Sequence, residues 1–157
     1  MSTFQEIMAQ KEKPAPLSSN NLDEQFWAHC AQERLCFQRC NSCDTWRHLP
    51  RHMCAACGSA QWRWEKSCGK GAIHSWTVAH LPTHPAFAGD VPYAVAIIEL
   101  QEGVRMVARL SGIKPADIVL DYEVELYFEK TTGGALLPFF RPRTEAQGSA
   151  VSPQSGS

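Results

Sequence analysis

The stretch CNSCDTWRHLPRHMCAACG, from Cys40 to Gly58, decides the local fold of this chain. It contains two Cys-x-x-Cys pairs separated by ten residues. Each pair places two sulfur atoms on one side of a tight turn, and two such turns supply the four soft ligands of a tetrahedral zinc site. We therefore predict a structural zinc site, with iron in a rubredoxin-like site as the rival metal. The predicted ligands are Cys40, Cys43, Cys54 and Cys57.

The residues after the two turns fit this interpretation. Gly58 directly follows the second pair, where such a turn needs a positive φ angle, and Asp44 holds the matching place after the first pair. A redox dithiol normally has one such pair in a βαβ setting, and coincidence among seven cysteines is the other alternative. The loop also carries His48 and His52, but four cysteines already complete a ligand set, so we expect an exposed basic loop.

Length and composition favour an ordinary globular protein. The chain has 157 residues, of which 44% are apolar, enough for one domain of ordinary size or two small ones. It has no apolar run near the length that a bilayer requires, and its first residues lack the pattern of a signal peptide. Three further cysteines, Cys30, Cys36 and Cys68, make the total odd, which suits a reducing compartment. We therefore expect a cytoplasmic protein without membrane contact.

Charge is balanced overall but unevenly distributed, with 15 basic and 16 acidic residues. Residues 34–70 contain seven Lys and Arg against two acids, whereas residues 90–129 contain eight acids against three basic residues. Four thiolates outweigh one divalent cation, so a metal site would add about two negative charges to the first half. We expect a mildly basic first half and an acidic second half.

Residues 21–66 are expected to form a helix followed by the zinc ribbon. Residues 1–20 are polar and contain two prolines, which predicts a flexible arm. A helix is predicted from Asn21, as its cap, to about Glu33, and its apolar face carries Leu22, Phe26 and Cys30. Strand-like alternation then occurs on either side of the two turns, in residues 34–39 and 62–64.

The rest of the chain predicts a small barrel. Strand patterns, separated by turn residues, occupy residues 72–79, 93–100, 104–110, 123–129 and 135–140. Five strands, a short helical turn after the third and no βαβ rhythm fit a five-stranded OB-fold barrel over residues 67–143. Residues 144–157 are rich in Ser, Gly, Pro and Gln and predict a disordered tail. The expected fold class is mainly β, with an N-terminal helix, a rubredoxin-like zinc ribbon and an OB-fold barrel.

In this order of elements the chain resembles the bacterial and archaeal family called domain of unknown function thirty-five. The resemblance covers residues 22–143. Its motifs are the four ribbon cysteines, Phe26-Trp27, CGS at 57–59, GKGAIHSWTV at 69–78, PYAVAIIEL at 92–100 and PFFRP at 138–142. Two departures concern turns, because Asp44 and Asp121–Tyr122 stand where the family often has glycine.

The resemblance implies a zinc-binding, noncatalytic accessory subunit of an enzyme that acts on acyl-CoA. Members of the family look like partners of thiolase-like proteins, including thiolases that act as aldolases on sterol side-chain CoA thioesters, and of hydratases. By this resemblance the partner carries the chemistry, and this chain completes or shields its active site within a hetero-oligomer. We expect no activity of the chain by itself.

Candidate contacts for the partner or for CoA lie on the helix, the ribbon loop and the start of the barrel: Phe26, Trp27, Trp46, Arg47, Arg51 and Lys70. Basic side chains there could face the anionic part of CoA or an acidic partner, although a solvated surface explains each of them singly. A second hypothesis is a nucleic-acid-binding OB-fold, which the acidic residues of 90–129 oppose because phosphate neutralisation supplies most of such affinity. A third is catalysis by a Cys68–His74 pair, which sequence separation does not support.

Overall fold

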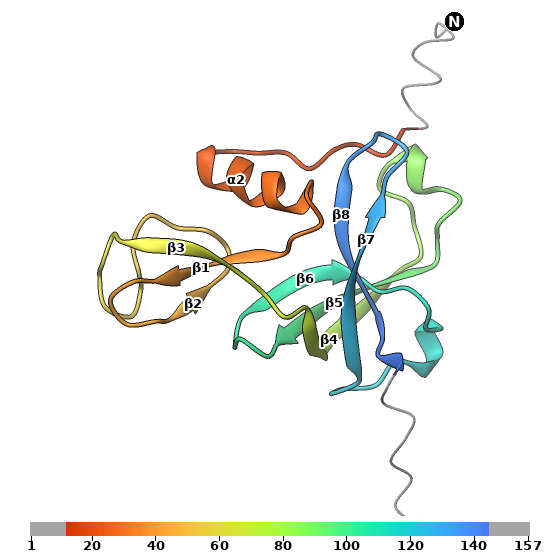
Figure 1. Cartoon of the computed structure of the whole chain (residues 1–157). Coiled ribbons are helices and arrows are strands. Elements are labelled where there is room, and N and C mark those ends of the chain that lie inside the picture. The colour runs from red at the N-terminus through yellow and green to blue at the C-terminus, as the bar shows by residue number, and fades with distance from the viewer. Residues whose placement is uncertain (1–11, 145–157) are drawn as a thin grey trace, which may run out of the picture.

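The computed structural model of the chain describes residues 12–144 and confirms a mainly β fold (Figure 1). One α-helix lies in this part, α2 (Asn21–Cys30). A three-stranded ribbon sheet follows, formed by β1 (Cys36–Cys40), β2 (Trp46–Arg47) and β3 (Trp62–Lys66). The second sheet contains β4 (Lys70–Ala79), β5 (Tyr93–Leu100), β6 (Arg105–Arg109), β7 (Glu123–Lys130) and β8 (Leu136–Pro142). Short 3-10 helices η1 and η2 occupy Pro85–Phe87 and Pro115–Asp117.

Helix α2 begins at Asn21, as predicted, but its capping residue lies one position earlier. The side chain of Asn20, not that of Asn21, accepts hydrogen bonds from the backbone N–H groups of Leu22 and Asp23, at 2.9 and 3.0 Å. These bonds satisfy two of the four N–H groups that a helix start leaves free. The helix ends at Cys30, three residues before its predicted end. The predicted apolar face is confirmed, since its three residues are all buried.

The five-stranded sheet curls into a nearly closed barrel with OB-fold connectivity. Its strand order is β6-β5-β4-β7-β8, and all neighbours are antiparallel. The two outer strands meet through a parallel bridge between Leu110 and Phe140, where the Ser111 N–H donates to the Phe140 carbonyl at 2.9 Å. Gly71 lets β4 approach β5, because a Cβ there would lie 2.5 Å from the Glu99 carbonyl oxygen.

The ribbon and the barrel share one hydrophobic core. Phe37 on β1 and Leu35, just before that strand, have no exposed surface. Both belong to the cluster that also contains Phe26 and the barrel residues Ile98 and Phe140. Burial of this apolar surface is the main stabilising contribution to a small fold. The division into a unit of residues 21–66 and one of 67–143 stays a prediction.

Backbone and side-chain hydrogen bonds fix the link between the ribbon and the barrel, residues 67–69. The buried Ser67 donates its backbone N–H to the Leu35 carbonyl at 2.8 Å and accepts the Gly69 N–H on its hydroxyl at 3.0 Å. The Gly69 carbonyl then accepts from the N–H of Leu126 at 2.7 Å. Gly69 has a φ of 70° and a Cβ there would lie 2.9 Å from that of Leu126, so this link requires glycine.

Part of the predicted arm contacts the barrel. Lys13 donates its backbone N–H to the Thr132 hydroxyl at 2.9 Å, and its ammonium lies 2.7 Å from a carboxylate oxygen of Asp90. Residues 1–11 of that arm, and residues 145–157 of the predicted tail, lie outside the described residues. Within residues 12–144 no helix is long and apolar enough to cross a membrane.

Candidate metal centre and apolar groove

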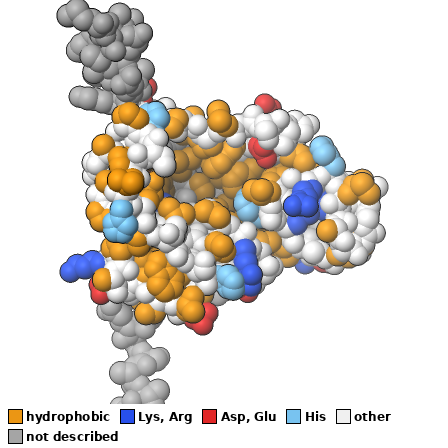
Figure 2. Space-filling view, turned by 180° about the vertical axis from the view of Figure 1, so that it is seen from behind, with side chains coloured by type: hydrophobic (Ala, Val, Ile, Leu, Met, Phe, Trp, Pro, Cys, Tyr) orange, Lys and Arg blue, Asp and Glu red, His pale blue; other side chains and the backbone are white. Residues whose placement is uncertain are grey.

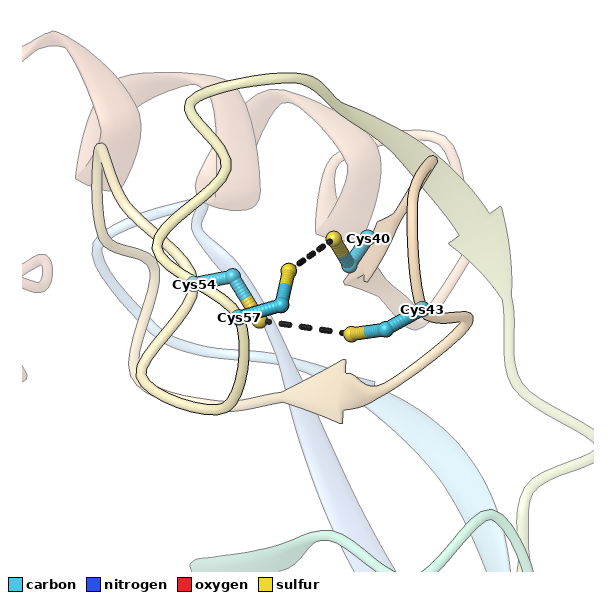
Figure 3. A group of neighbouring side chains, drawn as sticks. All are labelled: Cys40, Cys43, Cys54 and Cys57. Carbon is cyan, nitrogen blue, oxygen red and sulfur yellow. Dashed lines mark hydrogen bonds between the residues drawn. The ribbon is translucent and has the colours of Figure 1, made fainter.

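The four predicted ligands come together at the tip of the ribbon (Figure 3). Their sulfur atoms all lie within 4.8 Å of one another. The Cys40 and Cys57 sulfurs are 3.6 Å apart, as are those of Cys43 and Cys54. Sulfurs at such separations can surround one ion at the Zn–S distance of about 2.3 Å, so the donor set fits a tetrahedral cation site. The structure therefore brings the four predicted cysteines together in a group that could hold one metal ion.

The two turns that carry the sulfurs have the same backbone geometry. In the first, the Asp44 N–H donates to the Cys40 carbonyl at 3.1 Å, and in the second the Gly58 N–H donates to the Cys54 carbonyl at 2.8 Å. Gly58 has a φ of 74° and Asp44 a φ of 58°. Asp44 thus occupies the left-handed conformation predicted for it, which aspartate tolerates better than most residues.

Backbone N–H groups lower the pKa of two of the thiols. The backbone N–H groups of Cys43 and Ser42, with the larger effect from Cys43, hold the pKa of Cys40 at about 6. The equivalent groups of the second turn lower the pKa of Cys54. The Ser59 N–H lowers the pKa of Cys57, but hydrogen bonding with the sulfurs of Cys43, Cys40 and Cys54 outweighs it and raises that pKa to about 12. Hydrogen bonds that favour thiolates prepare the cluster for a cation.

Arg47 of the ribbon loop points inward and is held by a buried glutamine. Gln38 on β1 is completely buried and accepts the Arg47 Nε–H at 2.7 Å and the Arg51 backbone N–H at 2.8 Å. Arg47 also donates to the Arg51 carbonyl at 3.0 Å. These bonds order the predicted exposed basic loop, and Arg47 has a structural role in it.

His48 anchors the same loop to the core. Its ring packs against the rings of Phe26 and Phe37, with 5.2 Å between centroids in each case. Burial lowers the pKa of His48 to about 4, although Asp23 acts in the opposite direction. The loop therefore closes over the helix and β1 with a neutral imidazole.

We expect acid to destabilise the fold partly through His48. The unfolded chain protonates this residue near pH 6.5 and the folded chain only near 4, so the free energy of unfolding falls as pH drops through that window. Between pH 6.5 and 5 the loss is about 2 kcal/mol at most, at roughly 1.4 kcal/mol per pKa unit. Urea unfolding across this range should show a weaker pH dependence in His48→Gln than in the wild type. The exposed His52, changed to Gln, is the control, and an equal weakening there would contradict this role.

A large apolar groove lies between the helix, the ribbon loop and the barrel. It has a volume of about 770 Å³. Figure 2 shows hydrophobic side chains gathered around a hollow between the ribbon and the barrel. The helix contributes Trp27 to the groove, and the loop contributes Leu49, which is 64% exposed. The barrel side of the groove consists of Val95, Ile97, Arg105, Met106, Val107, Ala108, Arg109, Leu137, Pro138 and Phe139.

The candidate contact residues occupy three different places. Phe26 is buried in the core and reaches the groove, and the half-buried Trp27 lines it. Trp46, Arg47 and Arg51 line a second hollow, of about 450 Å³, on the ribbon loop. Lys70 is exposed on β4 and lines neither hollow. The assignment of these residues to a partner or CoA stays a prediction.

Sequence reasoning did not find the barrel side of the groove. Strand β5 is almost continuously apolar in sequence, and its outward residues Val95 and Ile97 face the groove. The available signal was that Val95 and Ile97 keep outward positions of β5 apolar, and that Val107 on β6, 66% exposed, is apolar as well.

The candidate Cys68–His74 pair does not form. The Cys68 sulfur lies 3.5 Å from the Gln101 side-chain oxygen, whereas His74 faces Glu99 at 3.6 Å. His74 also sits at a bulge of β4, where the register with β5 shifts. Partial desolvation of its sulfur raises the pKa of the Cys68 thiol, which disfavours the nucleophilic thiolate.

Family models match both parts of the chain. The rubredoxin-like zinc ribbon domain of ChsH2 matches residues 27–63, and the C-terminal OB-fold domain of ChsH2 matches residues 64–129. The two matches follow each other directly and cover the metal cluster and most of the barrel.

Curated relatives carry two kinds of name. A DUF35 domain-containing scaffold protein of Methanocaldococcus jannaschii is 33% identical over 107 residues, which cover 66% of this chain and 74% of that protein. A probable enoyl-CoA hydratase alpha subunit of Thermomonospora curvata is 43% identical over 128 residues. That match covers 81% of this chain but 40% of the relative, so the chain spans less than half of that protein's length.

A solved structure agrees in fold and sequence. A chain of the Ltp2-ChsH2(DUF35) aldolase superimposes with a TM-score of 0.74 and is 40% identical, over 83% of this chain and 98% of that chain. Together with the family models and the archaeal relative, this match shows that the chain belongs to the DUF35 family, in which a rubredoxin-like zinc ribbon precedes an OB-fold.

Proposed function

We propose that this chain is a noncatalytic scaffold subunit that assembles with a thiolase-like enzyme acting on acyl-CoA, and that it completes or shields the active site of that enzyme. The observation that carries the proposal is the match to the DUF35 chain of an aldolase complex, almost over that chain's full length. A hydratase alpha subunit among the relatives supports an acyl-CoA substrate. A hydratase-like subunit is therefore the alternative partner within the same proposal.

The surface around the groove supports a protein partner. Leu49, Val107 and Trp27 leave apolar area exposed beside one large groove, and exposed apolar patches of this kind mark interaction sites. The partner would cover this groove and exclude water from it.

The metal in this proposal is zinc with a structural role. Four sulfur ligands leave no open position for a substrate or a water, so the ion would hold the two turns together. The ribbon tip outside the shared core is small, and metal binding supplies folding free energy in such parts. Iron would instead give the red colour of a ferric thiolate site, which distinguishes the two metals in the purified protein.

A nucleic-acid-binding role is less well supported. OB-folds bind nucleic acids on the face of their second and third strands, through aromatic side chains and a basic groove. Here these strands are β5 and β6, and their groove residues Val95, Ile97 and Val107 are aliphatic. The arginines of β6 are paired as well, Arg105 with Glu99 at 2.8 Å and Arg109 with Asp90.

The test is purification of the tagged chain from its source organism, with mass spectrometry and metal analysis of the same eluate. We expect a thiolase-like or hydratase-like protein in stoichiometric amount and one zinc per chain. The complex should then form again from the two purified proteins in size-exclusion chromatography. Zinc-loaded chain that forms no such complex would refute the subunit role.

Replacement of Trp27 by Ala should weaken this complex at least tenfold and leave the zinc content at one per chain. Truncation of a central interface tryptophan commonly costs about 2 kcal/mol or more. Trp76, 37% exposed on β4 and outside the groove, provides the matched control, and Trp76→Ala should bind normally. If Trp27→Ala also lost zinc, its effect would reflect misfolding and not a contact.

A further inference from the structure

The groove contains an unpaired strand edge. In the β5–β6 ladder, the Leu110 N–H donates to the Ala94 carbonyl and the Leu100 N–H to the Val104 carbonyl. Hydrogen-bonded pairs alternate along an antiparallel ladder, so the even-numbered residues of β6 bond to β5. The backbone groups of Arg105 and Val107 therefore face the other way, toward the groove. Within the described residues neither has a backbone partner on that side.

The barrel does not satisfy this edge itself. Its two outer strands connect through the bridge at Leu110 and Phe140, beyond the end of β6. On β8, the Thr131–Ala135 and Glu123–Arg143 backbone bonds fix the alternation, so there the even-numbered residues face outward. One of these is Pro138, which has no N–H to donate. The edge of β6 is thus better able than that of β8 to pair with a further strand.

The groove has the shape and side chains that an added strand needs. All five residues of β6 line it, an edge about 17 Å long at roughly 3.4 Å per residue. Trp27 and Leu49 on one side, and Leu137 and Phe139 on the other, offer apolar surface to alternate side chains of an incoming segment. Strand addition uses this combination, in which backbone bonds give affinity and flanking pockets give specificity.

The charge at one end of the groove favours a segment with a carboxylate. Arg109 and Lys13 share a single carboxylate, that of Asp90, and Lys13 lies beside Phe87 in an adjoining hollow that Arg109 also lines. Glu129 lines the same hollow, but it accepts a hydrogen bond from Tyr127 and, among the described residues, forms no ion pair with Arg109 or Lys13. An acidic side chain of the partner could therefore pair with the cation that Asp90 shares.

From these observations we infer that the partner protein inserts an extended segment, with alternating apolar side chains and an acidic residue at one end, that pairs with β6 as an additional strand. This inference rests on the proposed scaffold function and names the contact through which that function operates. The segment pairs with Arg105 and Val107 and fills the opening between β6 and β8.

Val107→Pro tests the contact without removing any hydrogen bond of the barrel. The outward N–H of Val107 is lost, and proline is tolerated at sheet edges where the N–H faces solvent. With the partner purified as above, we expect at least tenfold weaker binding by titration calorimetry, with unchanged zinc content and a nearly unchanged melting temperature. Val107→Thr keeps the N–H and the branched shape and should bind within about threefold of the wild type, since exposed threonine suits a strand.

A second measurement needs no variant. Amide hydrogen exchange at Arg105 and Val107 should be fast in the free chain and slow in the complex, because both N–H groups gain acceptors. Wild-type binding by Val107→Pro, or exchange at these amides unchanged by the partner, would overturn strand addition while leaving the scaffold function intact. Failure of the wild type to bind any thiolase-like or hydratase-like protein would overturn both.

Discussion

Cys40→Ser should abolish metal binding and unfold much more than the ribbon tip. Structural zinc contributes about 10–16 kcal/mol in small zinc domains, whereas a whole domain is stable by only about 5–15 kcal/mol. Cys40 is completely buried at the end of β1, the strand that also places Phe37 in the shared core. We expect metal content near zero and loss of the cooperative unfolding transition, measured by metal analysis and circular dichroism.

Cys68→Ser is the matched control for this variant. Cys68 is exposed and lies outside the metal cluster, so its replacement should keep the metal and change the free energy of unfolding by less than about 0.5 kcal/mol. A Cys40→Ser protein that has lost its metal but melts like the wild type would contradict a structural role of the ion.

Phe37→Ala should destabilise the ribbon and the barrel together. The ring is completely buried and packs against His48, and removal of a buried phenylalanine costs about 3–5 kcal/mol. Because the four ligands remain, the variant should still bind one metal ion per chain. Urea unfolding followed by tryptophan fluorescence and by circular dichroism should give one coincident transition at lower denaturant.

The control is Phe87→Ala, which removes the same side chain from a half-buried position on η1. Phe87→Ala should lower the free energy of unfolding by less than half as much as Phe37→Ala. If Phe37→Ala produced an early separate transition of the ribbon and left the barrel transition unchanged, the two parts would not share one cooperative core.

The metal cluster and the strand pattern were predictable because they depend on local sequence. Two Cys-x-x-Cys turns form the same geometry wherever they occur, and the positive φ of Asp44 followed from its place after the first turn. The alternation of Val124 and its neighbours likewise identified β7 as a strand, in which Val124 is buried and Leu126 and Phe128 pack against the core. Such features need no knowledge of distant contacts.

The groove was not predictable because it depends on contacts between distant segments. It exists because His48 packs between Phe26 and Phe37 and thereby holds the ribbon loop over the helix. The inward position of Arg47 has the same origin, since only pairing of β1 with β2 brings it to Gln38. No periodicity in the loop sequence indicates either contact.

The hydrogen-bonded link of residues 67–69 has a consequence for the thermodynamics of association. If the link were flexible, the ribbon would lose orientational freedom when a partner bound it together with the barrel. That loss of entropy would weaken the affinity. Ser67 and Gly69 have already removed this freedom during folding. The chain therefore presents its metal-bearing tip and its barrel at one fixed angle, so a partner is selected by whether its own surface matches that angle.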